Sequence, residues 1–117
     1  MAEDFSKVQK LIFRYIREVQ EQGITIERAI LYGSYARGNA TEFSDIDFAL
    51  ISKDFCGIRF DDRCRVVPLR RKIDERLEPM PFLPEDFHAG NPLAADIMEH
   101  GIEIELEEVR LLHEAQK

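Results

Sequence analysis

The sequence predicts an α+β fold in two layers, in which a small mixed or antiparallel sheet carries helices packed on one side. Three observations lead to this prediction. Residues 4–22 repeat apolar side chains at three- and four-residue steps, the spacing of a helix that buries one face. Short apolar runs at residues 29–32 and 45–51 are typical of central strands. Residues 102–106 alternate apolar side chains with glutamates, as a half-exposed strand does.

Composition places the chain among ordinary globular proteins. Its 117 residues suffice for one domain with a modest core, so we expect a single domain over residues 1–117. No apolar stretch approaches the length of a membrane span, and the first four residues are acidic rather than signal-like. We therefore expect a cytoplasmic protein that does not contact a membrane.

The charge distribution argues against a protein that binds long nucleic acid. The net charge is −7, and only Arg70-Arg71-Lys72 form a basic cluster apart from acidic neighbours. A single nucleotide is still compatible with this charge, because a metal ion can offset negative charge locally. Cys56 and Cys64 form neither a disulfide framework nor a metal-ligand pattern, and we interpret them as reduced structural thiols.

The first half of the chain is predicted as helix, strand, turn and strand. The helix over residues 4–22 ends near Gly23 and packs on the sheet. A strand through Tyr32 leads to about a turn and a half of helix over residues 33–38. A polar loop then precedes the second strand, over residues 45–51. These two strands are expected to be neighbours, and the sequence leaves their pairing direction open.

Prolines interrupt the second half of the chain. We expect a loop over residues 52–60 and then a helix over residues 61–72, which Pro68 would kink or start. Residues 73–78 are predicted to form a third strand that stops at the following proline. Three prolines make residues 79–87 an extended, ordered connector.

The C-terminal part is predicted to add a helix and a strand. Residues 92–100 form a short helix that Gly101 ends, and residues 102–106 form the alternating strand. From residue 107 onward the chain is expected to be helical or frayed. Its apolar side chains would pack within the domain or in a homo- or hetero-oligomer.

Polar residues with catalytic potential follow or begin the two central strands. Gly33 lets the backbone turn sharply and a ligand approach, and Ser34 begins a short helix whose unpaired N–H groups favour anions. On a strand, Asp45 and Asp47 project from the same face, roughly 6.5–7 Å apart, while Ile46 turns into the core. Close carboxylates repel each other, and Mg²⁺ suits them because it takes hard oxygen ligands and shares them with phosphate. These features together predict a site for a metal–nucleoside triphosphate.

The stretch from Gly33-Ser34-Tyr35-Ala36-Arg37-Gly38 to Ser44-Asp45-Ile46-Asp47 resembles the signature of the DNA polymerase beta-type nucleotidyltransferase superfamily. In this fuller form it is similar to the minimal nucleotidyltransferase (MNT) branch, which includes the antitoxins of HEPN-domain toxins. The resemblance implies the nucleotidyltransferase fold, ATP or another NTP as substrate, and Mg²⁺ as cofactor. It also implies a HEPN-domain protein as partner, with a tyrosine hydroxyl that receives AMP.

The resemblance also implies a third carboxylate, which binds a second metal or acts as the base, on the strand after the intervening helix. The candidates are Asp74, Glu75 and Glu78. We favour Glu78 because it ends the predicted third strand and follows an apolar residue. Asp74 would share its face about 13 Å further along that strand. Many relatives carry aspartate here, so a glutamate departs from the family pattern.

Two functions from different classes follow. In the first, the chain is a nucleotidyltransferase and acts as an antitoxin. Its acceptor arrives on a partner, because the chain lacks the extra domain that larger relatives use for a second substrate. In the second, it is a partner-binding module with little or no catalysis. For Arg37, the resemblance implies a bidentate phosphate clamp, and the alternative is a surface arginine paired with Glu42 or Asp45. The predicted catalytic and metal-binding residues are Asp45, Asp47 and Glu78, and the predicted nucleotide-binding residues are Gly33, Ser34 and Arg37.

Overall fold

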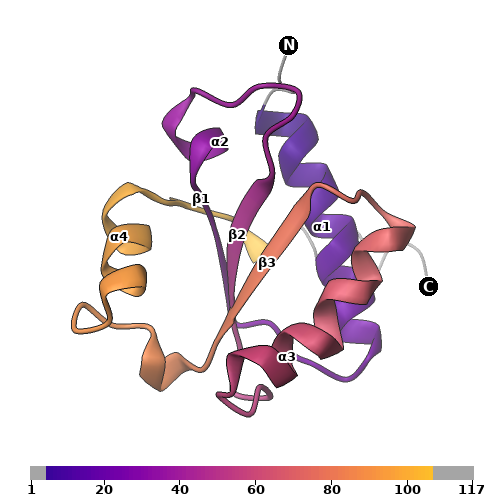
Figure 1. The fold of residues 1–117 in the computed structure, drawn as a ribbon. Helices are drawn as coiled ribbons and strands as arrows, with labels where there is room; N and C mark the ends of the chain where they lie inside the picture. The colour runs from indigo at the N-terminus through magenta and orange to yellow at the C-terminus, as the bar shows by residue number, and fades with distance from the viewer. Residues whose placement is uncertain (1–4, 107–117) are drawn as a thin grey trace.

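The computed structural model describes residues 5–106 of the chain, which form a sheet with helices against both of its faces (Figure 1). The helical elements are α1 (Phe5–Glu21), α2 (Ser34–Arg37), α3 (Arg59–Val66), the 3₁₀ helix η1 (Val67–Lys72), the 3₁₀ helix η2 (Pro84–Asp86) and α4 (Pro92–His100). The strands are β1 (Arg28–Tyr32), β2 (Ile46–Ile51), β3 (Leu77–Phe82) and β4 (Ile102–Glu103). The predicted α+β class is confirmed.

The sheet is mixed, with the strand order β3-β2-β1-β4. Strand β1 runs antiparallel to β2 and to β4, whereas β2 and β3 are parallel. The pairing places Asp47 of β2 between Tyr32 of β1 and Glu78 of β3. Strands β1 and β2 are therefore neighbours as expected, and the antiparallel alternative holds for them.

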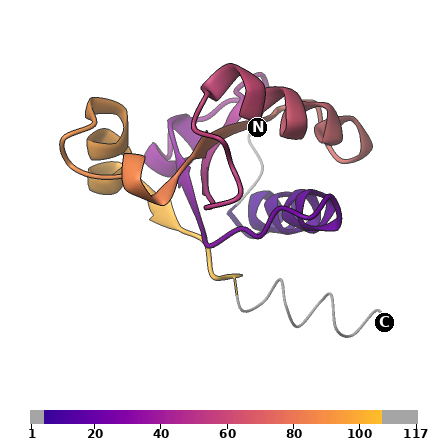
Figure 2. The same cartoon turned by 90° about the horizontal axis from the view of Figure 1, so that it is seen from below.

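Two apolar clusters cover the two faces of the sheet. Helices α1 and α3 lie on one side, and α4 lies on the other (Figures 1 and 2). Ile46, Phe48 and Leu50 of β2 belong to the α1 cluster, whereas Ala49 and Ile51 belong to the α4 cluster. Because successive side chains of a strand alternate between faces, Asp47 lies on the α4 face.

Helix α1 is the main cover of its face and confirms the predicted helix. Its stripe is fully or nearly buried, and burial of each such side chain contributes about 1.5–3 kcal/mol. The Tyr15 ring meets the Phe48 ring edge-on at 5.5 Å between centroids. The Tyr15 hydroxyl donates a hydrogen bond to the Val66 carbonyl, so α1 anchors both the sheet and the end of α3. The buried side chains of α1 are Val8, Ile12, Phe13, Tyr15, Ile16 and Val19.

The prediction for the third strand was wrong in its boundaries. Strand β3 runs from Leu77 to Phe82, so it begins near the expected end and contains two prolines. Within the described sheet β3 is an edge strand that pairs only with β2, and proline is tolerated where its missing N–H faces the open edge. Glu78 consequently lies at the beginning of β3 and not at its end. Because β2 and β3 are parallel, this places Glu78 level with Asp47.

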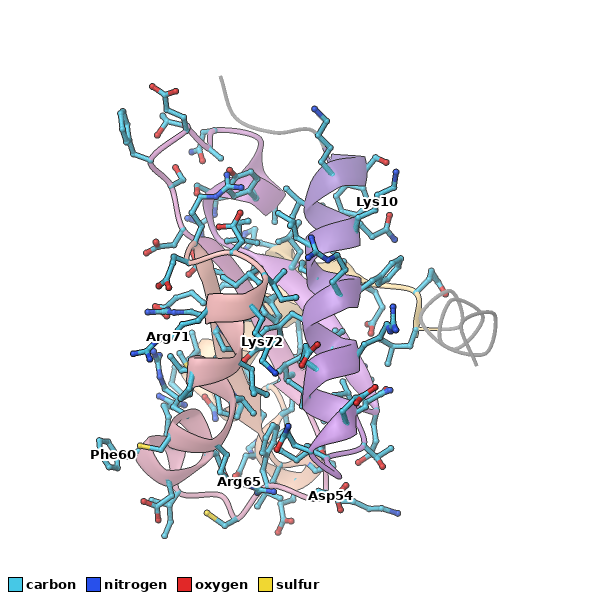
Figure 3. The ribbon with its side chains drawn as sticks, turned by 90° about the vertical axis from the view of Figure 1, so that its right-hand side faces the viewer. Lys10, Asp54, Phe60, Arg65, Arg71 and Lys72 are labelled. Carbon is cyan, nitrogen blue, oxygen red and sulfur yellow. The ribbon has the colours of Figure 1, made fainter. Side chains whose placement is uncertain are left out.

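The predicted helix over residues 61–72 divides into two elements. Helix α3 begins two residues earlier, at Arg59, and the 3₁₀ helix η1 continues from Val67. Pro68 lies in the first turn of η1, where a missing N–H interrupts no helical hydrogen bond. Figure 3 shows these two elements beside α1, with Lys72 between them and α1 and Arg71 pointing away. The Lys72 ammonium lies 3.5 Å from the Glu18 carboxylate of α1.

The remaining predictions concern the C-terminal part and the membrane. Helix α4 and its end at Gly101 agree with the prediction. The alternating segment pairs over only two residues as β4, after which the Ile104 amide donates to the Ala29 carbonyl at 2.8 Å. The prediction for residues 107–117 lies outside the described residues. No helix in the described part of the chain is long and apolar enough to cross a membrane.

Candidate active site

The first component of the site is the turn that follows β1. Gly33 has φ 73° and ψ −152°, a conformation that side-chain-bearing residues rarely adopt. The Arg37 amide donates to the Gly33 carbonyl at 3.1 Å, and the Asn39 amide donates to the Ser34 carbonyl at 3.1 Å. These bonds close a single helical turn, α2, which begins at Ser34.

Gly33 lies directly against the carboxylate of Asp47. A Cβ atom at Gly33 would approach Asp47 Oδ2 to 2.5 Å, closer than real contacts allow. The antiparallel register explains this approach, because Tyr32 is the partner of Asp47 across β1 and β2. The structure thus brings together the glycine turn and one aspartate of the predicted site. Only glycine satisfies both the backbone angle and the space.

Three carboxylates influence one another at this end of the sheet. Asp47 and Glu78 are register partners on adjacent strands, which lie about 4.8 Å apart in such sheets. Asp45 immediately precedes β2 and is exposed. Burial, followed by the negative charges of Asp45 and then Glu78, raises the pKa of Asp47 to about 6. Asp47 is therefore a carboxylate whose ionised form would gain from a nearby cation.

The neighbouring Tyr32 phenol stays protonated in this environment. Burial first, and then the charge of Asp47, raise the pKa of Tyr32 to about 12. Tyr32 is partly buried against the α4 cluster. It lies on the same face as Asp47, so it forms an uncharged wall of the site.

Glu78 differs from the two aspartates because arginines neutralise it. Its Oε1 accepts a hydrogen bond from Arg70 Nη1 at 2.8 Å and another from Arg63 Nη2 at 3.2 Å. The sequence interpretation did not find this role for either arginine. The only signal was the basic cluster that contains Arg70, which gave no hint of a partner.

The acidic residues were tested for their fit to Mg²⁺. Asp45 and Asp47 offer the hard oxygen donors that Mg²⁺ prefers, and the raised pKa of Asp47 shows that its charge is poorly compensated. Across residues 5–106, no three or more histidine, cysteine, aspartate or glutamate side chains are arranged to hold a metal ion. The aspartate pair therefore fits the metal, whereas Glu78 in its observed contacts does not complete a three-carboxylate set.

The alternative third carboxylates lie elsewhere. Asp74 precedes β3 and binds Arg76 through Nη2 at 2.8 Å and Nε at 3.0 Å, and these hydrogen bonds lower the pKa of Asp74. Glu75 is 72% exposed and lies 3.8 Å from Arg70. Of the three candidates, Glu78 alone is the register partner of Asp47.

Arg37 points to α4 in this structure. Its Nη2 lies 3.7 Å from Asp96 Oδ2, and both side chains are about half exposed. The partner is neither Glu42 nor Asp45, the two partners considered from sequence. Such an exposed, long ion pair is weak, so Arg37 can exchange Asp96 for another anion at little cost.

The family of the chain follows from comparison with known proteins. A family model described as "Polymerase beta, Nucleotidyltransferase" matches residues 14–108. The chain therefore belongs to the polymerase beta-type nucleotidyltransferase family, as its motif predicted. No curated protein matches the chain in sequence.

Two solved structures share the fold. One is an inferred nucleotidyltransferase from Sulfolobus solfataricus, with a TM-score of 0.55 and 23% identity, over 68% of this chain and 70% of that one. The other is described as a toxin-antitoxin with AMP-PNP, with a TM-score of 0.56 and 18% identity, over 85% of this chain and 78% of that one. At these identities the likeness shows the fold alone.

Proposed function

We propose that this protein is a Mg²⁺-dependent nucleotidyltransferase that transfers a nucleoside monophosphate, AMP from ATP, to a hydroxyl group. The observation that carries the proposal is the contact between the Gly33 turn and the Asp47 carboxylate, with Asp45 beside it. A backbone turn open to a ligand and an uncompensated carboxylate pair meet at one point. The family of the chain makes nucleotidyl transfer the reaction that this combination serves.

Each residue of the site has a proposed role. Gly33 and Ser34 bind the β- and γ-phosphates through backbone and hydroxyl donors, and Asp45 and Asp47 would hold Mg²⁺. When bound, Mg²⁺ supplies electrostatic stabilisation of charge that develops on the phosphate oxygens. Arg37, once released from Asp96, adds a bidentate contact to the phosphates.

The acceptor hydroxyl attacks the α-phosphorus in line. A bond forms between the acceptor oxygen and phosphorus, the bond to the bridging oxygen breaks, and pyrophosphate leaves with that electron pair. The hydroxyl proton must pass to a base, and Glu78 is the proposed acceptor of this proton. In the observed structure Glu78 must first exchange its arginine partners to do so.

For the acceptor, we propose a tyrosine of a HEPN-domain toxin, so that the protein acts as an antitoxin. Two features support this proposal: the Gly33–Gly38 motif is similar to that of the MNT antitoxins, and a toxin-antitoxin structure with AMP-PNP shares the fold. Label transfer from ATP to such a partner in the presence of Mg²⁺ is the expected activity.

A second candidate function is toxin neutralisation by binding alone. The observation that favours it is the pairing of Glu78 with Arg63 and Arg70, which leaves no complete three-carboxylate set within the described residues. A protein that had lost catalysis would have no need to keep Glu78 free. It would still carry the fold and its partner surface.

One experiment distinguishes the two functions. The full chain is incubated with Mg²⁺, labelled ATP and a HEPN-domain protein encoded next to it, and label on that partner is measured. We expect Asp45→Asn/Asp47→Asn to reduce labelling by at least about 10³-fold, since the carboxylates act only through the charged phosphates. The matched control is Asp61→Asn/Glu85→Gln, which removes the same charge from exposed positions outside the site.

The outcomes separate cleanly. Labelling that survives in the control and disappears in the aspartate variant supports the enzyme. Full neutralisation of toxicity by the aspartate variant, with no label on the partner under any condition, supports the binding module instead.

A further inference from the structure

Glu78 is bound by two arginines that come from outside the sheet. Arg63 belongs to α3 and Arg70 to η1, and both donate to the same oxygen of Glu78. The side chains of Arg63, Arg70 and Glu78 are 33%, 27% and 28% exposed. Hydrogen bonds between charged groups at this degree of burial are among the stronger polar contacts in proteins.

Arg70 is itself held in place by the chain around it. Its Nη1 also donates to the Leu77 carbonyl at 3.1 Å, and its own carbonyl accepts from the amides of Ile73 and Asp74 at 2.9 and 2.8 Å. The guanidinium is thus positioned by the turn that leads into β3. Arg63 adds the second bond from a helix that Tyr15 anchors at Val66.

The two neighbours on β2 and β3 therefore have opposite electrostatic surroundings. Asp47 has only carboxylates near it, and its pKa is raised for that reason and by burial. Glu78 has two positive partners at hydrogen-bond distance. A divalent cation that enters beside Asp47 gains a full carboxylate charge there, but it must displace a guanidinium to gain Glu78.

We infer that Arg63 and Arg70 are positioning residues that compete with the divalent cation for Glu78. In the nucleotide-free protein, Asp45 and Asp47 bind the cation without Glu78, and Glu78 becomes a ligand only when a guanidinium is withdrawn from it. This inference rests on the carboxylate pair of the proposed function. It goes beyond that function because it assigns a role to two arginines that touch neither substrate nor metal.

The test is a mutant cycle that measures binding of Mn²⁺ alone to the full chain by electron paramagnetic resonance, without nucleotide. We expect Glu78→Gln to change the Kd for Mn²⁺ by less than about twofold, because Glu78 is not a ligand. Arg70→Gln is expected to tighten Mn²⁺ binding about tenfold, because it releases Glu78. Glu78→Gln added to Arg70→Gln should remove that gain.

Matched controls separate release of Glu78 from a general loss of positive charge. Arg71 lies next to Arg70, is exposed and points away from α1 (Figure 3), so Arg71→Gln removes the same charge and should leave the Kd nearly unchanged. Arg70→Lys keeps the charge beside Glu78 and should retain the wild-type Kd. Arg63→Gln gives a second route to release and leaves the Arg70 contact with Leu77 intact. Circular dichroism shows whether each variant is folded at the temperature of measurement.

Three results would overturn the inference. Glu78→Gln alone could weaken Mn²⁺ binding tenfold or more, the gain in Arg70→Gln could survive the second substitution, or neither Arg70→Gln nor Arg63→Gln could show a gain. Absence of Mn²⁺ binding in every folded variant would overturn the aspartate pair as well. If the cycle behaves as expected but no label reaches any partner, the proposed transfer reaction fails while the inference stands.

Discussion

Asp47 and Glu78 lie side by side on parallel strands, yet their surroundings differ in charge. Asp47 meets the Gly33 turn and feels two other carboxylates, whereas Glu78 accepts hydrogen bonds from two arginines. The half of the site built by β1, α2 and β2 is electrostatically unsatisfied. The half built by β3, α3 and η1 is already satisfied by the protein.

This difference teaches where stability and function are in tension. A group that is satisfied within the protein contributes to folding and is costly to recruit for chemistry. An unsatisfied group costs folding free energy and is available to a ligand. The following predictions use the contrast between Asp47 and Glu78, beginning with the largest expected effect.

Gly33→Ala should have the largest effect. The new Cβ would lie 2.5 Å from Asp47 Oδ2 in a backbone conformation with φ 73°, so the turn and the carboxylate must move apart. We expect label transfer to fall about 100-fold, the size of loss that follows displacement of one catalytic group. Label transfer and the affinity for Mg²⁺-ATP are the measurements.

The control for this variant is Gly23→Ala. Gly23 has φ 86°, but nothing lies within 4 Å of an added Cβ, so only backbone strain is introduced. It should cost roughly 1 kcal/mol of stability and leave label transfer intact. Equal loss of label transfer in both variants would show that strain, and not the contact with Asp47, matters.

The same acid-to-amide change should have opposite effects on stability in the two halves. Glu78→Gln removes the charge that Arg63 and Arg70 bind and should lower the free energy of unfolding by about 2 kcal/mol. Asp47→Asn relieves repulsion and should raise it by about 1 kcal/mol at pH 7. Urea denaturation at low salt and without divalent cations measures both. Changes of the same sign would remove the contrast between the two halves.

Arg37 tests whether the satisfied and unsatisfied halves share the nucleotide. Arg37→Gln should raise the KM for ATP by about five- to tenfold with little change in kcat, because a phosphate contact is lost. Asp96→Asn removes the observed partner of Arg37, at 3.7 Å, and should leave KM unchanged or slightly lower. Steady-state label transfer over a range of ATP concentrations is the measurement, and an unchanged KM in Arg37→Gln would exclude the clamp.

The smallest predicted effect is a pH dependence of stability that Asp47 causes. Its pKa is raised from 3.8 to about 6 in the folded protein, so the folded state binds the proton more tightly than the unfolded state. Stability from this group is therefore present below about pH 4 and lost as the pH rises to about 6. Because Asp47 is only partly buried, solvent screening reduces the loss to about 1 kcal/mol. The free energies of unfolding of wild type and Asp47→Asn should diverge over this interval and run parallel above it; parallel curves throughout would contradict the prediction.

The local part of the site could be predicted from the sequence because it depends on short-range geometry. Gly33-Ser34 and Asp45-x-Asp47 lie on consecutive strands, and an antiparallel pair brings residues close in sequence together. The third strand was harder. Pro79 and Pro81 normally exclude a strand, and only the edge position of β3 in the described sheet makes them acceptable. Glu78 was chosen correctly as the neighbour of Asp47, although its expected position at the end of the strand was wrong.

The sequence by itself determined the glycine turn, the aspartate pair, the amphipathic α1 and the family of the protein, because local backbone preferences and hydrophobic periodicity specify all of these. Only the tertiary structure decided that Arg63 and Arg70 reach Glu78, and that Arg37 reaches Asp96. Long, flexible side chains bind whichever opposite charge the packing of distant elements brings within reach. The compensation of charge in this site is therefore a property of the assembled fold.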